Sequence, residues 1–113
     1  MISIYHNPRC SKSREALQIL EDNTNEFSVV RYLEDTPDEK ALENIITLLK
    51  IKPIELVRKN ESIWKDEYKG LNLTDKEIIA AMAKHPKLIE RPIVINGNKA
   101  TIGRPPQKIL DIL

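Results

Sequence analysis

Apolar and polar residues alternate at the start of the chain and then change their period. Residues 1–5 place Ile2 and Ile4 on one face, which predicts a short strand. From Ser11 to about Asp22 the apolar residues recur every three or four positions, as in an amphipathic helix. Residues 27–33 are rich in β-branched and aromatic side chains, which favours a second strand. Strand, helix and strand in this order indicate a βαβ unit with a parallel pair.

The middle of the chain has helical patterns. Thr36-Pro37-Asp38-Glu39 is typical of a capping box with proline at the first helical position, and helical spacing continues to Leu49. Residues 53–57 predict one helical turn and residues 62–68 a short helix. A second capping box, Thr74-Asp75-Lys76-Glu77, opens a further helix that His85-Pro86 should end. We therefore expect a helical insertion over about residues 37–90.

The last part returns to strands. Asn96-Gly97 lies between two β-rich runs, 91–95 and 98–102, which predicts a hairpin with a type I′ turn. Residues 103–106 should open a final helix that docks on the sheet through Ile109, Leu110 and Leu113. The order β-α-β, helices, β-β-α is that of a thioredoxin-like α/β fold: one domain over residues 1–113, with a mixed four-stranded sheet flanked by helices. By analogy with that fold, Pro92 should follow a cis peptide bond.

Composition narrows the class of protein. The chain has 18 basic and 17 acidic residues and a net charge of +1, so no global field should recruit nucleic acid or an anionic membrane. One cysteine and two histidines offer neither an internal disulfide nor a metal cluster. Without a leader or an apolar run long enough to span a membrane, we expect a cytoplasmic protein.

Cys10 stands where the first strand ends and the first helix begins, with His6, Arg9, Lys12 and Arg14 around it. The unpaired N–H groups and positive dipole of a helix N-terminus favour a thiolate, and Arg14 one turn later adds to this effect. A free cysteine can also be a small buried hydrophobe, but these neighbours are polar. Ser13 occupies the position of the second cysteine in a C-x-x-C motif, so a second thiol must come from outside.

Three further arginines lie at predicted element boundaries: Arg58, Arg91 and Arg104. Each alone could be a solvated surface charge. Guanidinium groups match tetrahedral oxyanions bidentately, and Arg91 and Arg104 precede prolines, which restrict the backbone. The three arginines could therefore converge on an oxyanion.

Essentially the whole chain resembles the glutaredoxin-coupled, glutathione-dependent arsenate reductases, in their short-chain branch. The resemblance is carried by five segments, residues 5–14, 31–34, 56–60, 85–94 and 103–105. It implies that Cys10 attacks arsenate, that glutathione resolves the adduct and that glutaredoxin removes the glutathione, with no bound cofactor. It also implies oxyanion binding by Arg58, Arg91 and Arg104, support of the thiolate by His6 and Ser13, and a cis-proline at Pro92.

Two other functions remain open from the sequence. The Spx transcription factors share this fold and bind RNA polymerase, but they usually carry a C-x-x-C switch, which Ser13 removes here. A glutathione-dependent thiol transferase would need Cys10 but not all three arginines. We expect an enzyme that acts as a monomer, with arsenate or a similar oxyanion, glutathione and glutaredoxin as its partners.

Overall fold

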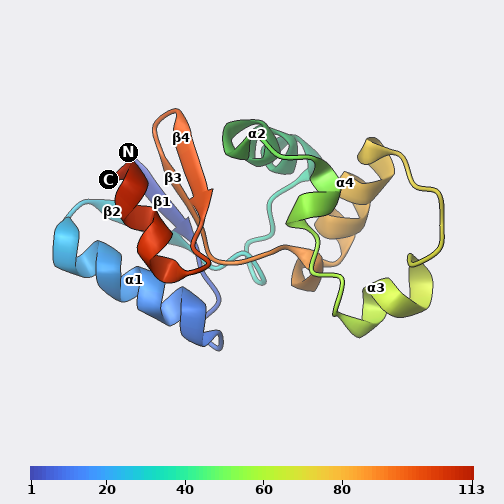
Figure 1. Cartoon of the computed structure of the whole chain (residues 1–113), viewed down its shortest axis with the longest axis horizontal. Helices are drawn as coiled ribbons and strands as arrows, with labels where there is room; N and C mark the ends of the chain where they lie inside the picture. Colours follow the sequence, from blue (N-terminus) through green and yellow to red (C-terminus); the bar gives the residue numbers. More distant parts are fainter. The chain divides into compact units, whose positions relative to one another are not determined.

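The computed structural model describes all 113 residues, which form two compact units. The first unit combines Met1–Asp35 with Arg91–Leu113 and contains the whole sheet. The second unit, Thr36–Glu90, contains the remaining helices (Figure 1). Its range corresponds to the helical insertion expected over about residues 37–90. That residues 1–113 fold as a single domain stays a prediction.

The sheet of the first unit is mixed and four-stranded, in the order β2-β1-β3-β4. Its strands are β1 (Ile2–Tyr5), β2 (Phe27–Val30), β3 (Ile93–Asn96) and β4 (Lys99–Ile102). β1 pairs parallel with β2 and antiparallel with β3, and β4 is antiparallel to β3. This is the sheet of a thioredoxin-like fold, as expected. The carboxyl ends of β1, β2 and β4 and the start of β3 meet at one edge of the sheet.

β2 is shorter than the pattern predicted. It ends at Val30, and the next residues turn because the N–H groups of Glu34 and Asp35 donate to the Arg31 carbonyl at 3.0 and 2.8 Å. The apolar composition of residues 31–33 suited a strand, but β1 ends at Tyr5 and so offers no further strand partner. The segment instead forms a turn beside the end of β1.

The hairpin between β3 and β4 is present, but its turn is not the one that the sequence predicts. Asn96 pairs with Lys99, so the two central residues are Gly97 and Asn98 rather than Asn96 and Gly97. Gly97 has φ 62°, whereas Asn98 is not at positive φ. Positive φ at only the first central residue is the pattern of a type II′ turn, so the type I′ prediction was wrong.

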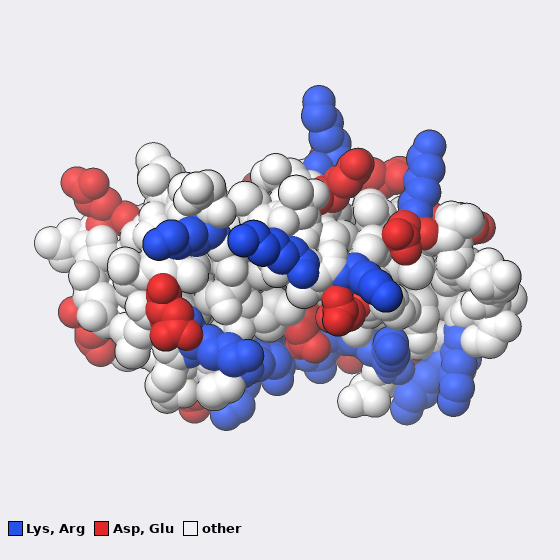
Figure 2. All heavy atoms as spheres, turned by 45° about the horizontal axis from the view of Figure 1, so that its top comes forward, with Lys and Arg blue, Asp and Glu red and all other residues white.

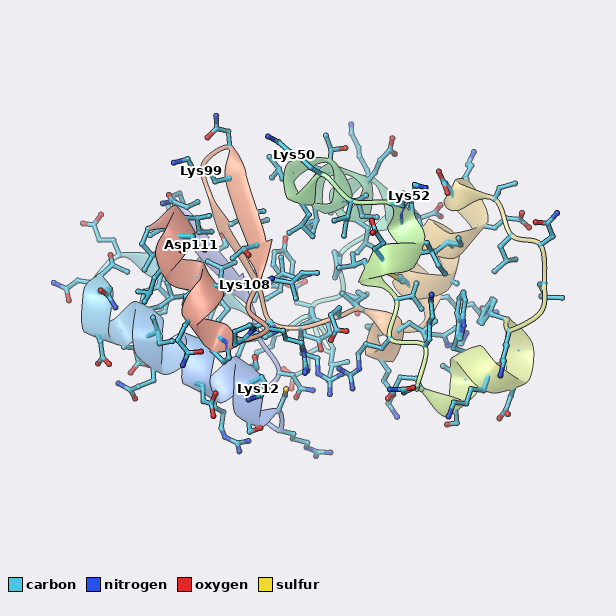
Figure 3. The ribbon with its side chains drawn as sticks, in the orientation of Figure 1. Lys12, Lys50, Lys52, Lys99, Lys108 and Asp111 are labelled. Carbon is cyan, nitrogen blue, oxygen red and sulfur yellow. The ribbon has the colours of Figure 1, made fainter.

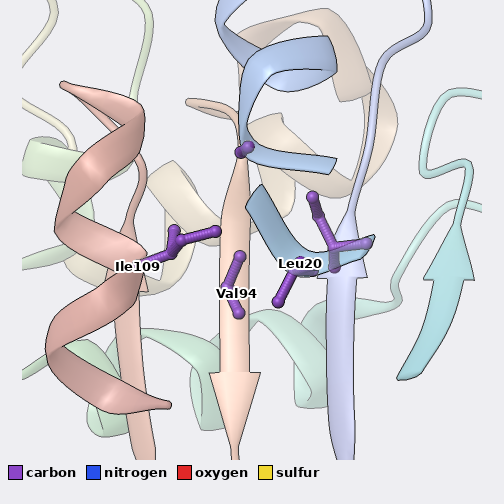
Figure 4. Close-up of a cluster of buried hydrophobic side chains, with 5 residues drawn as sticks. Leu20, Val94 and Ile109 are labelled. Carbon is purple, nitrogen blue, oxygen red and sulfur yellow. The ribbon is translucent and has the colours of Figure 1, made fainter. Parts of the chain in front are cut away.

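One face of the sheet is covered by α1 (Ser11–Asn23) and η3 (Pro106–Ile112), a 3₁₀ helix. Their fully buried core joins two strands to both helices through Ile4, Ala16, Leu20, Val94 and Ile109 (Figure 4). Burial of each large aliphatic side chain contributes about 1.5–3 kcal/mol. This packing fixes the start of α1 against the ends of the strands.

The final helix docks through Ile109, as expected, but not through Leu110 and Leu113. Ile109 is buried, but Leu110 and Leu113 are 48% and 43% exposed. A 3₁₀ helix has three residues per turn, so Ile112 follows Ile109 on the face that packs on the core. The prediction assumed α-helical spacing, which explains why it chose the wrong neighbours of Ile109.

The second unit is helical. Its elements are α2 (Glu39–Leu49), η1 (Pro53–Leu56), α3 (Ser62–Glu67), α4 (Asp75–Lys84) and η2 (Pro86–Leu88). The Thr74–Glu77 capping box is present, and α4 ends at Lys84 before His85-Pro86, as expected. α2 begins later than predicted, because Asp38 and not Thr36 is its N-cap and accepts a hydrogen bond from the Ala41 N–H at 2.8 Å. No helix in the chain has the length and apolar character needed to span a membrane.

Candidate active site

Cys10 is the N-cap of α1, at the edge of the sheet where β1 ends. Its carbonyl accepts the first helical hydrogen bond, from the Arg14 N–H at 3.0 Å, and its own N–H donates to the Asn7 carbonyl at 3.0 Å. The first turn of α1 contains no acidic side chain, in contrast to the first turns of α2 and α4. The dipole and the N–H groups at this helix end are therefore not offset by a carboxylate of the helix itself.

The loop before Cys10 is held by Ser13. The Ser13 hydroxyl lies 2.6 Å from His6 Nδ1 and accepts a hydrogen bond from the Asn7 N–H at 2.9 Å. All three residues are buried, at 5% exposure for His6, 9% for Asn7 and 0% for Ser13. Buried polar groups that are fully hydrogen-bonded fix one conformation of a loop. The sulfur is thus carried on a rigid segment.

The pKa of the Cys10 thiol lies below its ordinary value. Burial alone would raise this pKa, but the backbone N–H of Ser13, the side chain and charge of Arg91, and the backbone N–H of Lys12 together lower it by more. Each of these groups stabilises the anionic sulfur through hydrogen bonding or charge. Cys10 is a free cysteine and only partly buried, so its sulfur is accessible.

Arg91 lies just before β3 and Arg104 just after β4, so both lie at the sheet edge where β1 ends. Arg104 Nη2 lies 3.7 Å from the Cys10 sulfur, and Arg104 Nε donates to the Arg91 carbonyl at 2.7 Å. Arg104 therefore contacts the sulfur, and Arg91 is one of the groups that lower its pKa, after the backbone N–H of Ser13. Two guanidinium groups beside one thiolate form a setting suited to an oxyanion.

The backbone around these arginines is closely packed. The Arg91–Pro92 peptide bond is cis, as expected, and so is Arg104–Pro105. The Gly103 N–H donates to the Pro92 carbonyl at 2.9 Å, and a Cβ at Gly103 would lie 2.9 Å from Pro92 Cγ and 3.3 Å from Ile109 Cγ2. Only glycine fits this contact, which places Arg104 next to Arg91.

The side chains of His6 and Ser13 bond to each other and to the loop, and not to the Cys10 sulfur. The pKa of His6 is lowered, first by burial and then by the charge of Arg31, so the imidazole is neutral at pH 7. The Ser13 hydroxyl bonds His6 and Asn7, and it is the backbone N–H of Ser13 that stabilises the thiolate. The positive charge near the sulfur therefore comes from arginines and not from an imidazolium.

The side chains of Arg14 and Lys12 interact with groups other than the Cys10 sulfur. Arg14 Nη1 donates to the Pro8 carbonyl at 2.9 Å, and Arg14 is not among the groups that shift the Cys10 pKa. Its support of the thiolate stays a prediction, although it does tie the loop to the helix. Lys12, at the start of α1 in Figure 3, is exposed and has Glu15 Oε2 3.9 Å from its Nζ.

Arg58 belongs to the second unit, where it follows the short bridge between Val57 and Ile89. Its backbone N–H donates to the Leu88 carbonyl at 2.7 Å, and its Nη1 donates to Glu90 Oε1 at 2.9 Å. The two side chains are 20% and 24% exposed, and Arg58 Nε is buried without a hydrogen-bond partner. A convergence of Arg58 with Cys10 stays a prediction.

Three residues of this region were missed by the sequence analysis. Asn7 accepts from Cys10 N–H through its carbonyl and from Arg9 N–H through its side chain, and the Asn-Pro dipeptide was the available signal. Gly103 was noted only as the start of a helix and as part of a motif, and not for its close contact with Pro92. Glu90 was noted only as part of a motif, yet it is the ion-pair partner of Arg58.

Charge elsewhere is mixed. On the face shown in Figure 2, basic and acidic side chains are interspersed, consistent with the net charge of +1. No group of three or more histidine, cysteine, aspartate or glutamate side chains is arranged to hold a metal ion.

The fold and the site define a class: a thioredoxin-like protein with a single activated thiol at the start of its first helix and guanidinium groups beside the sulfur. Residues 5–112 match the model of the ArsC family. The chain is 47% identical to the protein YfgD of Escherichia coli strain K12, over 99% of this chain and 96% of that protein. The chain belongs to the ArsC family.

The relatives of the chain include arsenate reductases. The chain is 41% identical to an arsenate reductase of Haemophilus influenzae, over 99% of this chain and 98% of that protein. The structure of an arsenate reductase from Vibrio cholerae matches with a TM-score of 0.95 and 43% identity, over 99% of this chain and 97% of that chain. Both alignments include the site as well as the sheet.

Proposed function

We propose that the protein reduces arsenate to arsenite with Cys10 as the nucleophile, and that glutathione and glutaredoxin supply the electrons. The observation that carries this proposal is the 3.7 Å contact between Arg104 Nη2 and the Cys10 sulfur, together with the lowered pKa of that thiol. The arsenate reductase names of relatives at 41–43% identity support the substrate.

In the first step the Cys10 thiolate displaces an arsenate oxygen, which leaves as water after protonation, and forms a sulfur–arsenic(V) bond. Arg91 and Arg104 hold the negative oxygens that arsenic retains. Arg58 would add a third guanidinium.

In the second step the glutathione thiolate attacks the Cys10 sulfur. The sulfur–arsenic bond breaks and its electron pair stays on arsenic, which becomes arsenite, while the two sulfurs form a mixed disulfide. Glutaredoxin then attacks the glutathione sulfur and releases the Cys10 thiolate. The requirement for external thiols follows from the single cysteine of the chain, which would stay reduced in the cytoplasm.

The test is arsenite production by the purified protein with arsenate, glutathione and glutaredoxin. Cys10→Ser should give no arsenite above the rate without enzyme, because the pKa of a hydroxyl is far too high for the same attack. Turnover by Cys10→Ser would contradict the mechanism. Normal kinetics after replacement of each of Arg58, Arg91 and Arg104 by alanine would instead favour a thiol transferase.

A further inference from the structure

A cavity of about 270 Å³ lies beside the loop that carries Cys10. One wall is formed by the four residues His6 to Arg9, which immediately precede the cysteine. The opposite wall is the turn after β2, including Arg31, Leu33 and Glu34. This turn is fixed by the hydrogen bonds of Glu34 and Asp35 to the Arg31 carbonyl, so the cavity has a defined backbone on both sides.

The strand order places this cavity on the other side of Cys10 from the site arginines. β1, which leads to Cys10, has β2 on one side and β3 on the other. Arg91 and Arg104 come from the β3 and β4 side, whereas Arg31 follows β2. Displacement at sulfur takes place in line, so an attacking thiol must approach opposite the leaving arsenic. With arsenic on the Arg91 and Arg104 side, the thiol approaches from the β2 side.

The walls of the cavity suit a small organic acid. Arg9 and Arg31 contribute two guanidinium groups against the single carboxylate of Glu34, and the imidazole of His6 is neutral. Leu33, 38% exposed, and Pro8 give an apolar part. The volume is much larger than a tetrahedral oxyanion needs, so an arsenate ion alone would leave most of it unfilled.

We propose that this cavity binds a carboxylate-bearing end of the resolving thiol, glutathione, and so directs its sulfur to the β2 side of Cys10. The proposal rests on the proposed function, which requires an external thiol. At neutral pH glutathione has two carboxylates and one ammonium group, so it complements a lining with an excess of guanidinium charge.

Kinetics with two different thiols test this site. Arg31→Ala should raise the KM for glutathione roughly tenfold, the value expected for loss of one charge-assisted contact. The KM for arsenate should not change, and neither should the rate with 2-mercaptoethanol, which has no carboxylate. Lys108→Ala, an exposed change on η3 (Figure 3), is the control and should leave both thiols unaffected. An unchanged KM for glutathione, or equal losses with both thiols, would overturn the proposal.

A binding experiment separates this proposal from the proposed function. S-methylglutathione cannot react, so its binding to Cys10→Ser can be followed through backbone amide signals by NMR. Shifts at His6, Asn7, Arg9 and residues 31–34 that disappear in the Cys10→Ser/Arg31→Ala protein would support the site even if the wild-type protein reduced no arsenate. No shifts, or shifts confined to other residues, would exclude the site even if arsenate reduction were observed.

Discussion

Oxyanion binding is predicted for Arg91 and Arg104 in the first unit and for Arg58 in the second. The side chains of these arginines are held differently. Arg104 is anchored through Nε to a neutral carbonyl, and its Nη2 contacts the Cys10 sulfur. Arg58 is anchored to a carboxylate, that of Glu90, which offsets its positive charge. A guanidinium held by a carbonyl keeps its charge available for an anion, whereas one held by a carboxylate must share it. We therefore expect Arg91, whose hydrogen bond and charge lower the thiol pKa, to activate the thiol. We expect Arg58 to act on the oxyanion without changing that pKa.

The largest expected effect comes from Arg91→Ala. It should raise the pKa of Cys10, since both the hydrogen bond and the charge of Arg91 lower that pKa. It should also lower kcat/KM for arsenate roughly 10- to 100-fold, because a hydrogen bond to a charged group contributes about 1.5–3 kcal/mol. Ultraviolet titration of the thiolate and steady-state kinetics measure the two changes.

Arg58→Ala is the matched control for that experiment. It should weaken arsenate turnover but leave the Cys10 titration unchanged, because Arg58 is not among the groups that shift this pKa. If both variants moved the titration equally, the distinction between the two kinds of arginine would be wrong.

The sequence predicted the fold and the neighbourhood of Cys10 better than it predicted individual contacts. Periodicity located the helices and strands, because burial on one face requires a regular spacing of apolar residues. It failed where local geometry decides: the type II′ turn at Gly97, the 3₁₀ spacing that leaves Leu110 and Leu113 exposed, and the Asp38 cap. Residue type also could not reveal that the Ser13 hydroxyl bonds His6 while its backbone serves the sulfur, or that Glu90 holds Arg58.

The next largest effect is on the free energy of unfolding, through the hydrogen bonds that fix the loop before Cys10. Ser13→Ala removes the acceptor for the buried Asn7 N–H and the partner of His6 Nδ1. A buried polar group left without its partner costs about 1–3 kcal/mol, so the free energy of unfolding should fall by that amount in urea denaturation. Ser11→Ala, exposed in the same turn, should change stability by no more than about 0.5 kcal/mol. Equal stability of the two variants would show that the loop does not depend on this network.

A smaller effect is expected from Glu90→Gln, which leaves the Arg58 charge without its carboxylate. Phosphate, as a competitive inhibitor of arsenate, should bind roughly two- to fivefold more tightly, since a partly exposed ion pair contributes at most about 1 kcal/mol. The gain should shrink at high salt, where such pairs are screened. Glu67→Gln, an exposed change on α3, serves as the control. Weaker phosphate binding in Glu90→Gln would mean that Glu90 positions Arg58 rather than competing with the anion.

The smallest effect is on the pH dependence of stability. The native pKa of Cys10 is below its ordinary value, so the folded state favours the thiolate more than the unfolded state does. The resulting stabilisation is fully present above the unfolded-state pKa and is lost as the pH falls through the native pKa. Urea denaturation of wild type and Cys10→Ser across this pH range should therefore give a stability difference that shifts in favour of the wild type as pH rises. Arg91→Ala should weaken that dependence and Arg58→Ala should preserve it, because of these two arginines Arg91 is the one that lowers the thiol pKa. A difference that does not depend on pH would mean that the sulfur is not activated, and the contrast between the two arginines would then lose its chemical basis.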